Sequence, residues 1–334
     1  MRVARLLTCI YLGASLAGCA GEEAEAPQPE VATPAQETPT EATQAQEAPF
    51  QETGAQERPD AAPTTDFIAD AAWSPDGARL AVTWDRGTGA RLYGLLAGTD
   101  STPPEPGRGL PLSDGRGAWA TWAPSGLWMA YEAVGDLARM RPDGTFAEPL
   151  LEAPGTQTRP AWSPDGSRLA FLAPTDPSDP SSLLGIGLMA ARGGTPELLA
   201  LDVEGRATSV AWHPDGTLVT GLVTSEGPGI HRVDTESGSA VRIASGEDPA
   251  VSSEGAWLWY ARSDSIFRRS WTEGEAGVGP EEAVVAPGHR PAPAPDGLRL
   301  AYVVGNRPTS TLYLLHLETG ERLRLSEDAP ALRR

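Results

Sequence analysis

The chain has 334 residues, with 26 Lys and Arg against 45 Asp and Glu, and a formal net charge of −19. A surface this acidic repels the phosphates of nucleic acids and of anionic lipids, so binding to DNA, RNA or a charged membrane surface is excluded as a main function. Only two cysteines occur, at positions 9 and 19, which leaves no material for a disulfide framework.

Residues 1–18 have the pattern of a secretion signal. Arg2 and Arg5 supply a positive end, an apolar run follows at 6–16, and small residues come next. The run is shorter than the roughly 20 apolar residues that a membrane span requires. We therefore predict a signal peptide rather than a transmembrane helix.

The residues around position 19 resemble the bacterial lipobox. Leu16-Ala17-Gly18-Cys19 matches that motif at every position. The resemblance implies that the Cys19 sulfur is diacylated and that Cys19 becomes the mature N-terminus, with Cys9 removed. An ordinary secretion signal that happens to be cleaved beside a cysteine is the alternative.

Residues 19–65 form a low-complexity segment after the lipobox. Ala, Pro, Thr, Gln and Glu dominate, and Ala-Gln-Glu recurs at 35–37, 45–47 and 55–57. Such a composition cannot bury enough apolar surface to offset the entropy of ordering the chain. We predict a disordered acidic linker, which as a flexible coil spans roughly 35–40 Å.

From residue 66 to residue 334 one turn motif recurs. In Ala161-Trp162-Ser163-Pro164-Asp165-Gly166, proline presets φ for a tight turn and glycine takes the left-handed conformation that closes it. Alternating apolar residues flank the motif, which is typical of strand, turn, strand. The Trp position of the motif falls at Trp73, Trp122, Trp162, Trp212, Val251 and Pro293, in steps of 49, 40, 50, 39 and 42 residues.

Steps near forty residues, each with about four short strands, are typical of a β-propeller. Six copies predict an all-β fold: a six-bladed β-propeller of four-stranded antiparallel blades over 66–334, with the last strand of the third blade at 197–201. The hairpin resembles the Trp-Ser-Pro-Asp-Gly unit of TolB-type propellers, from about Asp66 to the C-terminus. Related blades serve scaffolds, ligand binders and the gating domains of prolyl oligopeptidases, so the resemblance implies the fold and not one function.

The motif tryptophans are predicted to pack between blades, whereas the position three residues earlier is predicted to reach the central channel. Near the face of the strand-two-to-three loops, that position holds Asp70, Trp119, Arg159, Ser209, Asp248 and Arg290. One interpretation is a solvated rim with incidental ion pairs. The other is a mixed-charge mouth that accepts a peptide or small ligand, with Asp70, Trp119, Arg159, Asp248 and Arg290 as candidate partner-binding residues.

Catalytic motifs are not found in the sequence. The four histidines, His213, His231, His289 and His316, do not share metal-ligand spacing. No Gly-x-Ser-x-Gly elbow and no glycine-rich phosphate loop after a strand occur. We therefore predict no catalytic residue, no metal site and no cofactor.

These features predict a cell-envelope lipoprotein whose propeller is a non-catalytic scaffold for a protein or peptide partner. It would touch the membrane through its N-terminal lipid only and would not bind nucleic acid. Ala20 after Cys19, where an aspartate would favour retention in the inner membrane, points to the outer membrane, facing the periplasm or the surface. TolB proteins carry an α/β domain where this chain has a linker, so a place in the Tol–Pal system is not implied. The alternative is a propeller enzyme, a lyase or lactonase, with its site in the central channel.

Overall fold

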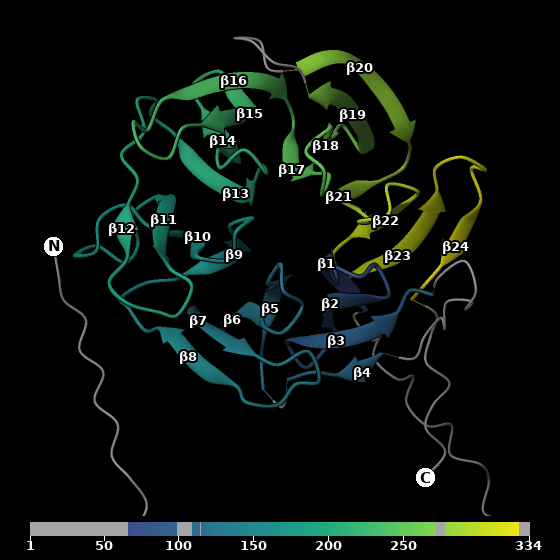
Figure 1. Cartoon of the computed structure of the whole chain (residues 1–334), viewed down its shortest axis with the longest axis horizontal. Coiled ribbons are helices and arrows are strands. Elements are labelled where there is room, and N and C mark those ends of the chain that lie inside the picture. The colour runs from purple at the N-terminus through teal and green to yellow at the C-terminus, as the bar shows by residue number, and fades with distance from the viewer. Residues whose placement is uncertain (1–65, 99–108, 114, 272–277, 327–334) are drawn as a thin grey trace, which may run out of the picture. The chain divides into compact units, whose positions relative to one another are not determined.

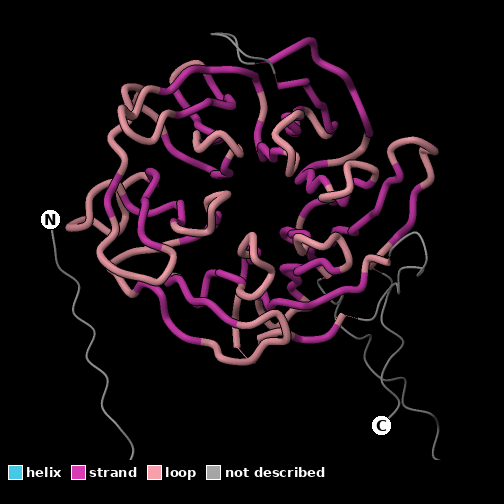
Figure 2. The backbone as a smooth tube through the Cα atoms, in the orientation of Figure 1, coloured by secondary structure: helices cyan, strands magenta, loops and turns pink. Residues whose placement is uncertain are grey.

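The computed structural model describes residues 66–98, 109–113, 115–271 and 278–326. These residues form six sheets arranged in a ring around a central channel (Figure 1). Strands and connecting loops make up the ring (Figure 2), and no helix in this part of the chain is long and apolar enough to span a membrane. The predicted signal peptide 1–18, Cys19 and the linker 19–65 lie outside the described residues.

Each blade consists of four consecutive antiparallel strands. The first comprises β1 (Phe67–Trp73), β2 (Arg79–Asp85), β3 (Ala90–Leu96) and β4 (Leu110–Pro111). The second comprises β5 (Ala118–Trp122), β6 (Met129–Ala133), β7 (Asp136–Met140) and β8 (Glu148–Leu151). The third comprises β9 (Thr158–Trp162), β10 (Arg168–Pro174), β11 (Leu184–Ala190) and β12 (Glu197–Leu198).

The second half of the ring repeats this order. The fourth blade comprises β13 (Arg206–Trp212), β14 (Leu218–Thr224), β15 (Gly227–Val233) and β16 (Ala240–Ser245). The fifth comprises β17 (Glu247–Val251), β18 (Trp257–Arg262), β19 (Ser265–Trp271) and β20 (Val278–Val285). The sixth comprises β21 (His289–Pro293), β22 (Arg299–Asn306), β23 (Thr309–His316) and β24 (Arg322–Arg324). The predicted six-bladed, all-β architecture is confirmed.

The hydrophobic core lies between blades rather than within one sheet. One cluster joins Trp84 and Leu80 of the first blade to Val303 and Leu312 of the sixth. Five further clusters each join two neighbouring blades in the same way. Every blade is thus stabilised by burying both of its faces against its neighbours.

The motif tryptophans make the predicted contacts between blades. The Nε1–H groups of Trp73, Trp122 and Trp212 each donate to a backbone carbonyl of the preceding inner strand. The acceptors are Ala292, Ala72 and Ala161, at 2.8, 3.1 and 3.0 Å respectively. In the third blade the pattern breaks, because the Nε1 of Trp162 is buried without a partner among the described residues.

Three of the interblade contacts also include an arginine, placed two residues after the glycine of the turn. Its guanidinium lies over the motif Trp of the next blade. The pairs are Arg79 with Trp122, Arg168 with Trp212, and Arg299 with Trp73, at 5.3, 5.8 and 4.8 Å from the ring centroid. The turn motif therefore encodes a contact with the next blade as well as its own hairpin.

Candidate functional site

The inner strand of every blade contains a β-bulge at one register position. Its ladder skips at residues 68–70, 118–121, 158–161, 207–209, 247–250 and 289–292. The bulges contain or end at the six positions predicted to form a ring. In four of them the residue is left-handed: Trp119, Arg159, Asp248 and Arg290 have φ of 53°, 52°, 51° and 52°.

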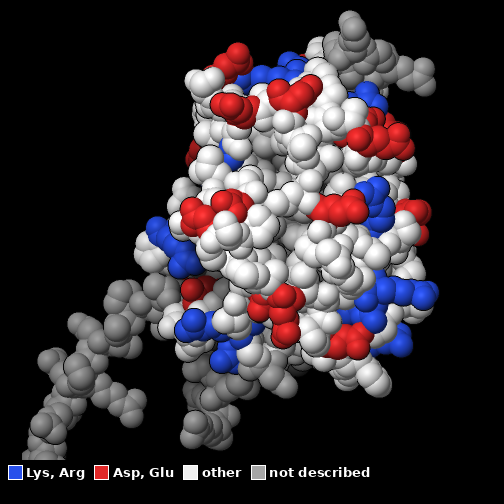
Figure 3. Space-filling view, turned by 90° about the vertical axis from the view of Figure 1, so that its left-hand side faces the viewer, with Lys and Arg blue, Asp and Glu red and all other residues white. Residues whose placement is uncertain are grey.

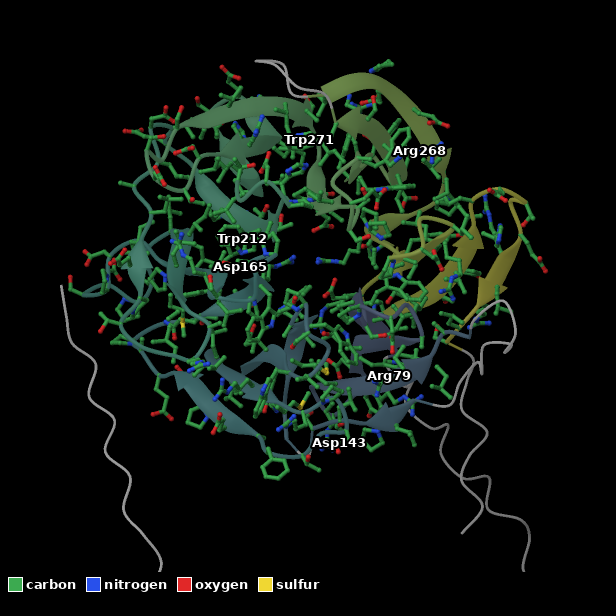
Figure 4. All side chains as sticks on the ribbon, in the orientation of Figure 1. Arg79, Asp143, Asp165, Trp212, Arg268 and Trp271 are labelled. Carbon is green, nitrogen blue, oxygen red and sulfur yellow. The ribbon has the colours of Figure 1, made fainter. Side chains whose placement is uncertain are left out.

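A left-handed conformation costs a non-glycine residue about 1–2 kcal/mol, so four such residues at one level are unusual. Bulges re-aim side chains, and here they turn the side chains toward the channel. All six predicted positions, Ser209 included, line one cavity of about 320 Å³ inside the channel. Figure 4 shows side chains from all round the ring reaching into this opening. The predicted convergence of Asp70, Trp119, Arg159, Asp248 and Arg290 is thus present.

Four of these side chains meet across the channel, and we call Trp119, Arg159, Asp248 and Arg290 the channel cluster. Nη1 of Arg159 lies 3.8 Å and Nη1 of Arg290 lies 3.5 Å from Oδ1 of Asp248. The same two guanidinium groups lie 3.8 and 4.8 Å from the centroid of the Trp119 ring. The cluster therefore joins four different blades through charge and cation–π contacts.

Asp70 completes the charge balance beside the cluster. Burial raises the pKa of its carboxyl from 3.8 to about 6, and the positive charges of Arg290 and Arg159 only partly oppose this shift. Burial, together with the nearby Arg290, lowers the pKa of Arg159. With Asp70 ionised, two arginines face two aspartates. With Asp70 protonated, the group carries one net positive charge.

A second cavity of about 320 Å³ shares Arg159, Asp248 and Arg290 with the first, and its other lining residues include Glu247, Asp264 and His289. Asp264 comes from the loop between strands two and three of its blade, so this cavity lies on the loop side of the ring. We call this cavity together with the channel cluster the mouth. Burial raises the pKa of Glu247 and lowers that of His289.

The residues around the mouth were not all visible in the sequence. Burial also raises the pKa of Glu132, which accepts a hydrogen bond from Thr158. Among the described residues, the three carboxyl groups whose pKa is raised, Asp70, Glu132 and Glu247, thus all lie at this end of the channel. Glu247 and His289 directly precede ring positions, so a register extended by one residue would have found them. Glu132 could be found only from the strand pairing, because β6 places it opposite Ala118 of β5.

The remaining chemistry-bearing residues do not assemble into a second centre. Over the described ranges, no group of three or more His, Cys, Asp or Glu side chains is placed to hold a metal ion. His213 is stacked on Trp271 at 4.1 Å between ring centroids, and its Nε2 lies 3.0 Å from the Gly255 carbonyl oxygen. Its environment is that of a packing residue. The predicted lipidation site, Cys19, lies outside the described residues.

Comparison with known proteins gives a likeness of fold. No family model and no curated protein sequence matches the chain. Among solved structures, TolB from Acinetobacter baumannii is similar, with 15% identity and a TM-score of 0.55 over 78% of this chain and 63% of that one. The fold is a TolB-like β-propeller.

The TolB-like propeller is also similar in fold to solved structures of other proteins. A gluconolactonase from Xanthomonas campestris has 17% identity and a TM-score of 0.55, over 75% of this chain and 86% of that one. A chain of a nidogen/laminin complex has 10% identity and a TM-score of 0.56, over 71% of this chain and 90% of that one. At such identities the likeness establishes the fold alone, and the present chain spans only 63% of the TolB chain.

Proposed function

We propose that this protein is a cell-envelope lipoprotein, anchored through Cys19, whose TolB-like propeller binds a protein or peptide partner at the channel mouth. One observation carries the proposal: four left-handed residues in four blades hold Trp119, Arg159, Asp248 and Arg290 together across the channel. Backbone strain that recurs at one level of the channel supports a functional constraint.

The composition of the mouth supports binding. Tryptophan and arginine are the residues that most often dominate the binding energy of protein interfaces, particularly in concave and partly desolvated settings. On the side of the propeller, acidic and basic side chains are spread over the surface (Figure 3), whereas those at the mouth converge on one cavity. A nidogen/laminin complex among the similar structures fits a propeller that binds proteins.

A second candidate function rests on Asp70. A carboxyl with a pKa of about 6, beside two arginines in a cavity, suits a general base in a lyase- or lactonase-type reaction. The likeness to a gluconolactonase fits this alternative. Asp70→Asn would abolish turnover in the enzyme but leave the affinity of a binding module within a few fold, so this variant separates the two functions.

The binding function is tested by reversing the two channel arginines. A partner captured from the native envelope with the tethered propeller should bind the Arg159→Glu/Arg290→Glu variant at least tenfold more weakly, measured at a temperature at which the variant is still folded. Charges gathered at a concave mouth act together on one ligand, whereas dispersed charges do not. The matched control is Glu236→Arg, in the exposed β15–β16 turn on the opposite face, which should leave the affinity unaltered. Equal losses in both variants would show that the partner does not bind at the mouth.

The anchor is tested separately. Cys19→Ser removes the acylated sulfur, so the protein should leave the membrane fraction or retain its signal peptide. Fractionation and mass determination of the N-terminus measure both outcomes. A correctly processed Cys19→Ser protein that stays in the membrane fraction would disprove the lipoprotein assignment.

A further inference from the structure

Beyond the channel cluster, the channel contains an apolar chamber, defined here as the part of the first cavity that follows the ring positions along the inner strands. Its walls are formed mainly by residues two positions after the ring and by two motif tryptophans: Ala72, Thr121, Ala161, Ala211, Trp162 and Trp212. The chamber thus has alanine, threonine and tryptophan side chains along its walls and the two arginines at one end. Such a cavity, about 320 Å³ with the ring included, is near the lower limit for small-molecule sites.

The two arginines at its end have unused hydrogen-bonding capacity. In the described part of the chain their carboxylate contacts are those with Asp248, at 3.8 and 3.5 Å, beyond ordinary hydrogen-bond length. Both side chains are 22% exposed. Outer-surface arginines differ, since Arg268 and Arg232 bond directly to Glu282 and Asp215 at 2.8 and 2.9 Å.

We propose, building on the proposed function of the channel as a binding site, that the chamber accepts a carboxylate attached to a small apolar group. The carboxylate binds between the guanidinium groups of Arg159 and Arg290, and the apolar group lies against the alanine and tryptophan walls. Guanidinium forks match the geometry of a carboxylate, which they can bind through paired hydrogen bonds. The source is either a free organic acid or the C-terminal residue of a peptide.

The charges around the channel cluster determine that the ligand is an anion and that it binds on the chamber side of the cluster. Glu247 and Asp264 line the mouth and repel an anion there, whereas the carboxyl groups that line the first cavity, Asp70 and Asp248, both face the two arginines. A cation in the chamber would face both arginines at close range. A phosphate dianion would meet Asp248 and Asp70 with twice the charge of a carboxylate, and the apolar walls cannot replace its hydration.

The test uses the full chain and four probes measured by titration calorimetry. Hexanoate and N-acetyl-alanyl-phenylalanine carry a carboxylate, whereas methyl hexanoate and the C-terminal amide of the same dipeptide do not. At least one acid should bind saturably, and its neutral counterpart should bind at least tenfold more weakly. Hexanoate binding identifies a free acid as the source, and dipeptide binding identifies a peptide C-terminus. Absence of binding by both acids, or equal binding of acid and neutral forms, would overturn the proposal without the use of any variant.

Two substitutions in the walls locate the site. Ala161→Leu/Ala211→Leu fills the chamber and should reduce binding of the acid at least tenfold, while the envelope partner still binds at the mouth. Thr121→Leu, a smaller change on the second blade, should also weaken binding of the acid. Ala190→Leu, on an exposed strand end, is the size-matched control and should have no effect. If the filled variants bind the acid normally, the chamber is not its site. If no acid binds but the arginine reversal still releases the partner, the chamber proposal fails and the proposed function stands.

Discussion

Asp70 lies at the bulge of β1, in an environment that disfavours the ionised form of its carboxyl group. Arg290, Arg159 and Asp248, from three other blades, face its carboxylate, and the two positive charges do not make up for lost hydration. The raised pKa means that the folded protein holds the proton more tightly than the unfolded chain does. The free energy of unfolding should therefore fall as the pH rises from about 4 to about 6, and the penalty is fully present above that range.

The Asp70→Asn variant tests this electrostatic penalty. Above pH 6 it should be more stable than the wild type, by up to about 3 kcal/mol, because a shift of two pKa units corresponds to that energy. Near pH 3.5 both side chains are neutral, so the difference should vanish. Urea unfolding at pH 7.5 and pH 3.5 measures both values. A variant that is less stable at pH 7.5 would show that the ionised carboxylate is well satisfied.

At the scale of single residues, the sequence predicts which residues share a level of the channel better than it predicts which of them touch. The register of three residues before the motif Trp identifies Asp70, Trp119, Arg159, Asp248 and Arg290 correctly as neighbours at one level of the channel. The sequence does not predict that Arg159 reaches past Ser209 to Asp248. That contact depends on the left-handed bulge, which an arginine has no particular preference to adopt, so it follows from the strand pairing and not from residue type.

The elements show the same division between local and long-range information. The hairpins were predictable because proline, aspartate and glycine set the turn locally, as the Gly166 N–H to Ser163 carbonyl bond of 2.9 Å and the Gly166 φ of 70° show. The bounds of the outer strands were less predictable. β12 spans only Glu197–Leu198, rather than the predicted 197–201, because an edge strand extends only as far as its one neighbour pairs with it.

The motif tryptophans offer a comparison inside one molecule. Trp212 donates to the Ala161 carbonyl, whereas the buried Nε1 of Trp162 has no partner within the described ranges. Trp212→Phe leaves a carbonyl without its donor, but Trp162→Phe removes an unsatisfied donor. We expect the first to lower the free energy of unfolding by about 1–2 kcal/mol more than the second.

Urea unfolding of the two variants measures this difference directly. Trp162→Ala supplies the scale, because a large-to-small change in a packed site costs about 3–5 kcal/mol. Equal losses for the two phenylalanine variants would mean that the Trp212 hydrogen bond contributes nothing to stability. An unchanged Trp162→Ala protein would mean that this tryptophan does not pack between blades.

For the molecule as a whole, the sequence predicts six blades but not how the ring closes. Among the described residues each sheet uses consecutive strands only, and no shared strand joins the sixth blade to the first there. Instead, Asp66 forms a parallel bridge with Thr309, and the Ser310 hydroxyl bonds both the N–H and the carbonyl of Ile68, at 2.7 and 2.9 Å. These contacts join residues more than 240 positions apart, which no local pattern reveals.

Arg299 makes a further contact between the sixth and the first blade. Its guanidinium donates to the carbonyls of Gly77 and Gly98 in the first blade, at 2.9 and 2.8 Å, and lies over Trp73. Arg168 occupies the equivalent place between the third and fourth blades, over Trp212 at 5.8 Å, without a carbonyl acceptor in the described residues. The same motif position therefore has an additional role where the two ends of the propeller meet.

Replacing Arg299 tests whether closure limits the stability of the ring. Arg299→Met removes the two charge-assisted hydrogen bonds to the first blade, the ion pair with Asp296 and the contact with Trp73, and should lower the free energy of unfolding by about 2–4 kcal/mol. Arg168→Met, which loses only a cation–π contact, should cost less than about 1 kcal/mol. Because an opened ring exposes the interface of its first and last blades, limited proteolysis of Arg299→Met should cut there first. Equal losses in the two variants, or cleavage beginning at the third or fourth blade, would show that the first and last blades are held together by their apolar cluster and not by Arg299.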